Sequence, residues 1–155
     1  MFNIFKNIFS FGKNGKKIKF ENGLIKKFKK DHEKLIEIYS QMLYLHSKKD
    51  FMNLKKEMKN FRVTVNLHIL EEDEKLYSYL VQESNGDKDK IKMHQEIHDE
   101  MKEIVRVVGE FFDKYEHNLL GSCEDKFHEE LREIGAVLTD RIDREENGLY
   151  TMYKK

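Results

Sequence analysis

Six histidine and glutamate residues interrupt the apolar stripes of this chain, and they form a candidate metal site. They are His32, His68, Glu72, His94, His98 and Glu145. Burying an imidazole or a carboxylate is costly unless the group is paired or coordinates a metal. Imidazole suits iron, copper, zinc or nickel, whereas carboxylate suits harder ions, so the combination indicates a transition-metal site. A polar core network without a metal is the alternative interpretation.

The spacing of these residues is helical. His68 and Glu72 are four residues apart, as are His94 and His98, and this spacing puts both side chains of a pair on one face of a helix. Two glutamates from two helices can bridge a pair of metal ions while histidines fill the outer positions. This chemistry therefore requires long helices that bring four such faces to one level.

The composition favours such helices. The chain has 155 residues, which is most simply one domain, and it contains no proline and only 8 glycines. Lys plus Arg and Asp plus Glu both number 29, so we expect no nucleic-acid partner. The single Cys123 excludes an intramolecular disulfide. Since no apolar run is long enough to span a bilayer and the N-terminus lacks a secretory pattern, we expect a cytoplasmic protein.

Apolar residues that recur at steps of three and four predict four helices. The stripes extend over about residues 22–48, 50–82, 91–119 and 122–145. Asp50 is the expected N-cap of the second helix, and Ser122, after the break at Gly121, is that of the fourth. Short links make sequential helices antiparallel, so the predicted fold is all-α: an antiparallel up-down-up-down four-helix bundle over residues 21–155.

Residues 1–20 differ in character and form a short N-terminal arm. The segment FNIFKNIFSF is rich in aromatic residues, and GKNGKKIK follows it. We expect this arm to pack on the surface of the domain itself. The alternative is a short amphipathic helix that contacts a membrane surface or a protein.

The candidate ligands fall at one depth in such a bundle. His32, Glu72 and His98 each lie about ten residues from the end where the first helix starts, or roughly 15 Å at a rise of about 1.5 Å per residue. The other three candidates lie within about one helical turn of that level. Arg141, four residues before Glu145, is expected in the same layer.

The motifs around these residues resemble the hemerythrin-like (HHE cation-binding) domain family. The motifs are DHEKL, HILEEDEKLY, HQEIH and REENGLY, and the resemblance covers about residues 22–153. It implies a four-helix bundle with a non-haem di-iron centre that binds dioxygen reversibly, or senses oxygen, redox state or iron. By this resemblance His32 and His68 would hold one iron, and His94 and His98 the other. Glu72 and Glu145 would bridge the two ions.

Arg141 departs from the family pattern, which usually has a histidine ligand there. Arginine has no free lone pair and cannot replace it. Three outcomes are open: a binuclear site with Arg141 as a hydrogen-bond donor beyond the ligands, a site with one metal, or a pair between Arg141 and Glu145 or Glu72 that abolishes the site. If Arg141 is exposed and the helix bulges, Glu146 is a substitute ligand.

The leading functional hypothesis is a protein with two iron ions, or one, that binds or senses dioxygen or a similar small ligand. Loss of a histidine opens coordination space, which favours a peroxidase- or oxidase-like enzyme as the alternative. A metal-poor bundle that acts as a regulator through its surface is the third hypothesis. We assign no role to the far-end residues His46, His117, His128 and Cys123.

Overall fold

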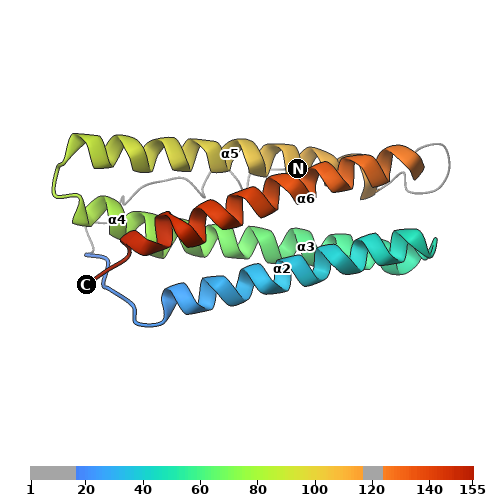
Figure 1. Cartoon of the computed structure of the whole chain (residues 1–155), viewed down its shortest axis with the longest axis horizontal. Helices are drawn as coiled ribbons and strands as arrows, with labels where there is room; N and C mark the ends of the chain where they lie inside the picture. Colours follow the sequence, from blue (N-terminus) through green and yellow to red (C-terminus); the bar gives the residue numbers. More distant parts are fainter. Residues whose placement is uncertain (1–16, 117–123) are drawn as a thin grey trace.

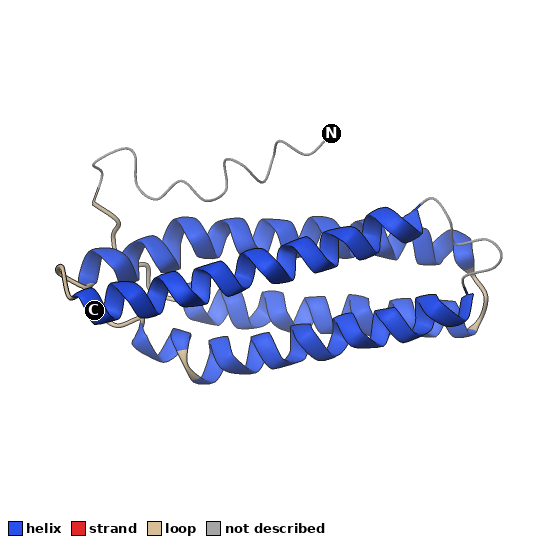
Figure 2. Ribbon diagram, turned by 90° about the horizontal axis from the view of Figure 1, so that it is seen from above, coloured by secondary structure: helices blue, strands red, loops and turns tan. Residues whose placement is uncertain are grey.

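A computed structural model describes residues 17–116 and 124–155, and it contains four long helices (Figure 1). They are α2 (Leu24–Ser47), α3 (Phe51–Glu71), α5 (Lys88–Glu116) and α6 (Glu124–Asn147). The helices run alternately up and down in an antiparallel bundle, and the described residues contain no strand (Figures 1 and 2). The predicted all-α fold is confirmed. The expected cap Ser122 lies outside the described residues, as do His117 and Cys123.

The second predicted helix is continuous but changes its geometry along its length. Asp50 caps its start, because its side chain accepts a hydrogen bond from the backbone N–H of Asn53 at 3.2 Å. Beyond α3 the chain continues through a π-helical turn, Glu72–Tyr77, into α4 (Ser78–Glu83). Asn85 and Gly86 then adopt positive φ angles of 49° and 81° and end the helical run.

The π-helical turn changes which side chains face the core. Its wider winding buries Glu72, Asp73, Leu76 and Tyr77 together, whereas two adjacent residues of a regular helix point about 100° apart. The hydroxyl of Ser78 donates to the backbone oxygen of Asp73 at 2.9 Å within this turn. Two consecutive carboxylates therefore reach the interior, and π-helical turns often occur at functional sites.

Buried ionisable residues separate two apolar clusters of the core. One cluster fills the half of the bundle that contains Met42, Met58, Phe112 and Leu131. The other occupies the opposite end and contains Leu24, Phe28, Leu76, Leu80 and Leu149. Between them along each helix lie the buried histidines and carboxylates of the predicted layer.

The described part of the N-terminal segment lies against the end of the bundle that holds the C-terminus (Figure 2). Ile18 and the side-chain amide of Gln82 exchange two hydrogen bonds of 2.8 and 2.9 Å. The ring of Phe20 stacks on Tyr153, with 4.8 Å between centroids. Residues 1–16 lie outside the described residues, so the division at residue 20 and the role of the arm stay predictions.

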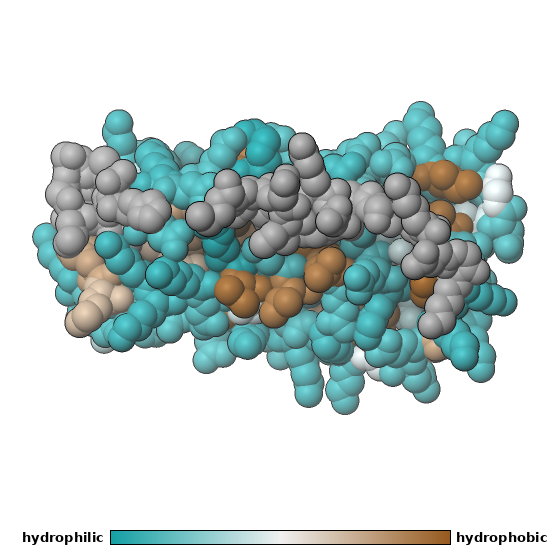
Figure 3. All heavy atoms as spheres, turned by 180° about the vertical axis from the view of Figure 1, so that it is seen from behind, coloured by the Kyte–Doolittle hydropathy of each residue, from teal (hydrophilic) through white to brown (hydrophobic). Residues whose placement is uncertain are grey.

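The outer faces carry the charged residues. On the face drawn in Figure 3 the described surface is mainly hydrophilic, with small apolar patches. Among the described helices, none combines the length and apolar character that a membrane crossing requires.

Candidate metal centre

Four of the predicted ligands meet in the core. His32 from α2, His68 from α3, Glu72 from the π-helical turn and Glu145 from α6 each offer one ligand atom, and these atoms lie within 4.8 Å of one another. All four side chains are buried. We call this group the four-residue cluster.

The distances within the four-residue cluster suit one metal ion. His32 Nε2 lies 3.1 Å from His68 Nε2 and 3.1 Å from Glu145 Oε2, and His68 Nε2 lies 3.7 Å from Glu72 Oε2. Ligands that each lie ~2.0–2.2 Å from one ion are roughly 3–4 Å apart. Two imidazole nitrogens and two carboxylates are also a donor set that a transition metal accepts. The residues present therefore fit a metal ion.

The charges of this cluster are uneven. Burial and the nearby His32 lower the pKa of His68 to about 4, so its imidazole keeps a free lone pair at neutral pH. Burial and the charge of Glu145 raise the pKa of Glu72 well above its ordinary value. Burial would also raise the pKa of Glu145, but the hydrogen bond from His32 and the charge of Arg141 lower it. One glutamate is thus ionised, and a bound cation would ionise the other.

A carboxylate lies behind each of the two histidines, but only the one behind His32 is within hydrogen-bond distance. Glu146 Oε1 lies 2.8 Å from His32 Nδ1, and Asp31 Oδ2 lies 3.7 Å from His68 Nδ1. A carboxylate at the outer nitrogen fixes the ring and leaves the other nitrogen for a metal. Glu146, which the sequence suggested as a substitute ligand, thus lies behind His32. The bulge required for that role is absent, because α6 is α-helical through Asn147.

Arg141 is buried beside the cluster and is fully engaged. Its Nε donates to Glu145 Oε1 at 2.5 Å, one terminal nitrogen donates to the hydroxyl of Tyr77 at 2.5 Å, and the other lies 3.4 Å from Glu100 Oε2. The alternative of an exposed Arg141 is therefore wrong, since the side chain is 4% exposed. The Arg141–Glu145 pair forms, and the four-residue cluster forms with it.

Comparison with known families agrees with this arrangement. The sequence model of the hemerythrin HHE cation-binding domain matches residues 23–153. The chain belongs to the hemerythrin HHE cation-binding domain family. No curated protein and no solved structure matches it.

The remaining two predicted ligands of this hemerythrin domain do not join the cluster. His94 and His98 are both buried on α5. His98 Nε2 lies 3.3 Å from Asp73 Oδ1, across the bundle on the π-helical turn. Burial lowers the pKa of His94, and the charge of Lys90 adds to this effect. The structure thus brings four of the six expected ligands together at one position. His94 and His98, the expected ligands of the second iron, lie outside that group.

Two buried tyrosines that were not among the predicted site residues contact the site of this hemerythrin domain. Tyr150 donates a 2.5 Å hydrogen bond to Glu72 and lies 3.1 Å from His32 Nε2, while Tyr77 accepts from Arg141. Each tyrosine ends one of the two similar stretches HILEEDEKLY and RIDREENGLY, and each contacts a residue of the other stretch. The similarity of the two stretches, which both end in Leu-Tyr, was the sequence feature that could have identified these tyrosines. Asp73 had no comparable signal, because helical periodicity does not predict a π-helical turn.

Proposed function

We propose that this hemerythrin domain binds iron at the four-residue cluster and uses it to bind dioxygen or a similar small ligand. The observation that carries the proposal is the convergence of His32, His68, Glu72 and Glu145 in a buried layer. Membership in a cation-binding family supports the presence of a metal. Iron at this position would supply an open coordination site for the small ligand.

The residues of the chain divide the work between them. His32, His68 and Glu145 each place one ligand atom toward the same point, and Glu146 holds His32 in the required orientation. A bound metal would replace the proton that His32 shares with Glu145. The hydroxyl of Tyr150 holds Glu72 in place. The apolar clusters lie on both sides of the layer and help to bury its four ligand side chains.

We further propose that the four-residue cluster takes the first ion and that a second ion binds weakly. Glu145 Oε1 is already bonded to Arg141, so this oxygen is less free to bridge toward His94 and His98. The guanidinium also adds a buried positive charge on that side, which opposes a second cation. The contact between Asp73 and His98 is the candidate for the weak second position.

Metal content tests the proposal. The full chain is loaded anaerobically with ferrous iron and desalted, and iron per chain is measured by mass spectrometry. We expect a value near one, and we expect His68→Ala to bring it near zero while His46→Ala, at a buried histidine outside the cluster, leaves it unchanged. A value near two in the parent chain contradicts the single tight site. A value near zero for iron and for other metals contradicts metal binding.

Small-ligand binding is tested by absorption spectroscopy of the ferrous protein. Dioxygen is expected to change the spectrum, and purging with argon is expected to restore it. No change, or immediate irreversible oxidation, would argue against a reversible oxygen-binding role.

A further inference from the structure

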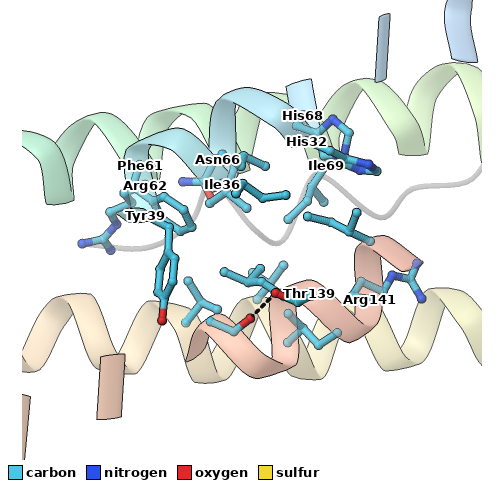
Figure 4. Close-up of a pocket in the computed structure, with 18 of the residues that line it drawn as sticks. His32, Ile36, Tyr39, Phe61, Arg62, Asn66, His68, Ile69, Thr139 and Arg141 are labelled. Atoms are coloured by element: carbon cyan, nitrogen blue, oxygen red, sulfur yellow. Dashed lines mark hydrogen bonds between the residues drawn. The ribbon is translucent and has the colours of Figure 1, made fainter. Parts of the chain in front are cut away.

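A cavity of about 270 Å³ adjoins the metal centre inside the bundle (Figure 4). It lies between the α2–α3 pair and the α5–α6 pair, and all four helices line it. His32, His68 and Arg141 lie at one end in Figure 4, and Phe61, Arg62 and Tyr39 lie at the other. The cavity thus begins at the proposed metal and extends into the half of the core that contains Phe112.

The cavity is much larger than packing or dioxygen requires. Protein interiors contain few voids larger than one water molecule, and an apolar cavity of ~150 Å³ is enough to bind benzene. A volume of about 270 Å³ therefore corresponds to an organic molecule of about 8 to 12 non-hydrogen atoms.

The lining residues indicate an elongated shape. On α3 they extend from Phe61 to Ile69, and on α6 from Gly135 to Glu145. At about 1.5 Å per residue these ranges cover roughly 12 and 15 Å along the bundle axis. An alkyl chain or a long aromatic molecule that lies parallel to the helices matches this shape.

The walls favour a ligand without charge. Apart from the residues at the metal end, the lining is mainly aliphatic and aromatic. Arg62, the cation at the far end, pairs with Asp113 at 2.9 Å and with Glu116 at 3.2 Å. Arg141 is paired in the same way with Glu145. Since both guanidinium groups are already neutralised, neither offers a free positive charge to a carboxylate.

The cavity has a route to solvent between α2 and α6. Ile36 lines the cavity and is also 47% exposed, and the lining residues Ser40 and Thr139 are exposed too. Beside them the phenol of Tyr39 lies over Gly135, where an added Cβ would meet its oxygen at 2.1 Å. This close approach, which glycine permits, places the aromatic ring of Tyr39 at the wall of the cavity.

We propose that this cavity binds a neutral, elongated apolar molecule, such as a medium-chain alcohol, with one end against His32, His68 and Glu145. This inference goes beyond the proposed function and does not depend on it. Binding relies on the apolar walls and is expected in the metal-free chain as well as in the iron-loaded one.

The first test titrates 1-alkanols into the full, metal-free chain by calorimetry. We expect one molecule of 1-octanol per chain, and an affinity that rises about fourfold per methylene from 1-butanol upward. The increase should stop when the chain length exceeds the cavity. Absence of saturable binding, or an affinity that keeps rising through 1-dodecanol, overturns the proposal. Octanoate should bind at least tenfold more weakly than 1-octanol, and equal or tighter binding overturns the assignment to neutral ligands.

Matched variants locate the site. Val108→Phe and Leu138→Phe place a ring in the cavity, whereas Val107→Phe and Val137→Phe place it at the adjacent positions, which are 36% and 39% exposed and outside the lining. We expect at least tenfold weaker binding in the first pair and less than a twofold change in the second. Equal affinity in all four variants means surface binding and overturns the proposal.

The thermal midpoints of the same variants provide an independent check. Because the ring enters existing space, Val108→Phe and Leu138→Phe should shift the midpoint by less than about 3 °C. Filling a tightly packed core would instead strain it. A large loss of stability in both variants overturns the cavity itself, and the chain-length series in the parent protein remains decisive if one variant fails to fold.

Discussion

The pKa values of Glu72 and Glu145, the two glutamates of the four-residue cluster, shift in opposite directions because the residues around them differ. Arg141 and His32 lower the pKa of Glu145 against the effect of burial, whereas burial and the charge of Glu145 raise the pKa of Glu72. Arg141 and Tyr150 both come from the stretch RIDREENGLY, and each bonds to a residue of HILEEDEKLY: Arg141 to Tyr77 and Tyr150 to Glu72. The replacement of one histidine by arginine therefore changes the charge of the site and also the hydrogen-bond network around it.

Arg141→His is expected to raise iron from near one to near two per chain. The change removes a buried cation from Glu145 and supplies an imidazole on the side of His94 and His98, where the hemerythrin resemblance leads us to expect one. Mass spectrometry after ferrous loading measures the effect. The control is Arg144→His on the same helix, whose side chain is 46% exposed. If Arg141→His stays near one, Arg141 is not what limits the second position.

Tyr150→Phe is expected to destabilise the metal-free protein by about 1–2 kcal/mol, because it leaves the buried Glu72 carboxyl without its 2.5 Å hydrogen bond. Urea unfolding measures the change. Tyr44→Phe is the control, since Tyr44 is 55% exposed and its replacement should change the unfolding free energy by less than about 0.5 kcal/mol. Equal effects of the two substitutions would contradict a role for Tyr150 at the carboxyl.

At the level of the helices, the spacing of apolar residues predicts some features of the structure and not others. Steps of three and four predicted each stripe, the residue type of Asp50 predicted the cap, and the short links predicted the antiparallel order. The depth count predicted one layer for the six candidate ligands, and all six are buried. Periodicity cannot tell which of them converge, because that depends on rotamers and on distances between helices. It could not predict that Asp73 turns inward, since a π-helical turn departs from the period itself.

Deletion of Glu74 tests the role of the π-helical turn. Glu74 is an exposed residue of that turn, and its removal lets a regular α-helix keep Glu72, Leu76 and Tyr77 at spacings of three and four while Asp73 rotates outward. We expect iron binding at the four-residue cluster to change by less than about threefold, with helical content retained by circular dichroism. Loss of the first iron would show that the π-helical turn positions Glu72 itself. Asp73→Ala, which leaves the helix length intact, is the matched control.

At the scale of the whole molecule, a metal at the four-residue cluster would connect three helices and omit the fourth. Its ligands come from α2, from the α3 run and from α6, whereas the histidines of α5 lie outside it. A ligand that binds only the folded state stabilises it by RT ln(1 + [L]/Kd), or about 4 kcal/mol at a thousandfold excess over Kd. Amides that exchange only through global unfolding gain this protection in every helix. Amides that exchange through local opening gain it only where the ion holds the segment.

Hydrogen exchange with and without ferrous iron, under anaerobic conditions, measures this difference. We expect the locally exchanging amides near His32, His68 and Glu145 to slow at least tenfold, and those of α5 around His94 and His98 to slow less than threefold. The far end of α2 near His46 is the internal control, because it lies outside the cluster on one of the connected helices. Equal slowing around His94 and His98 would mean that α5 supplies ligands after all, and the site would then be the binuclear one that the sequence resemblance implies. A response confined to three helices would instead mean that a single ion holds α2, α3 and α6 together.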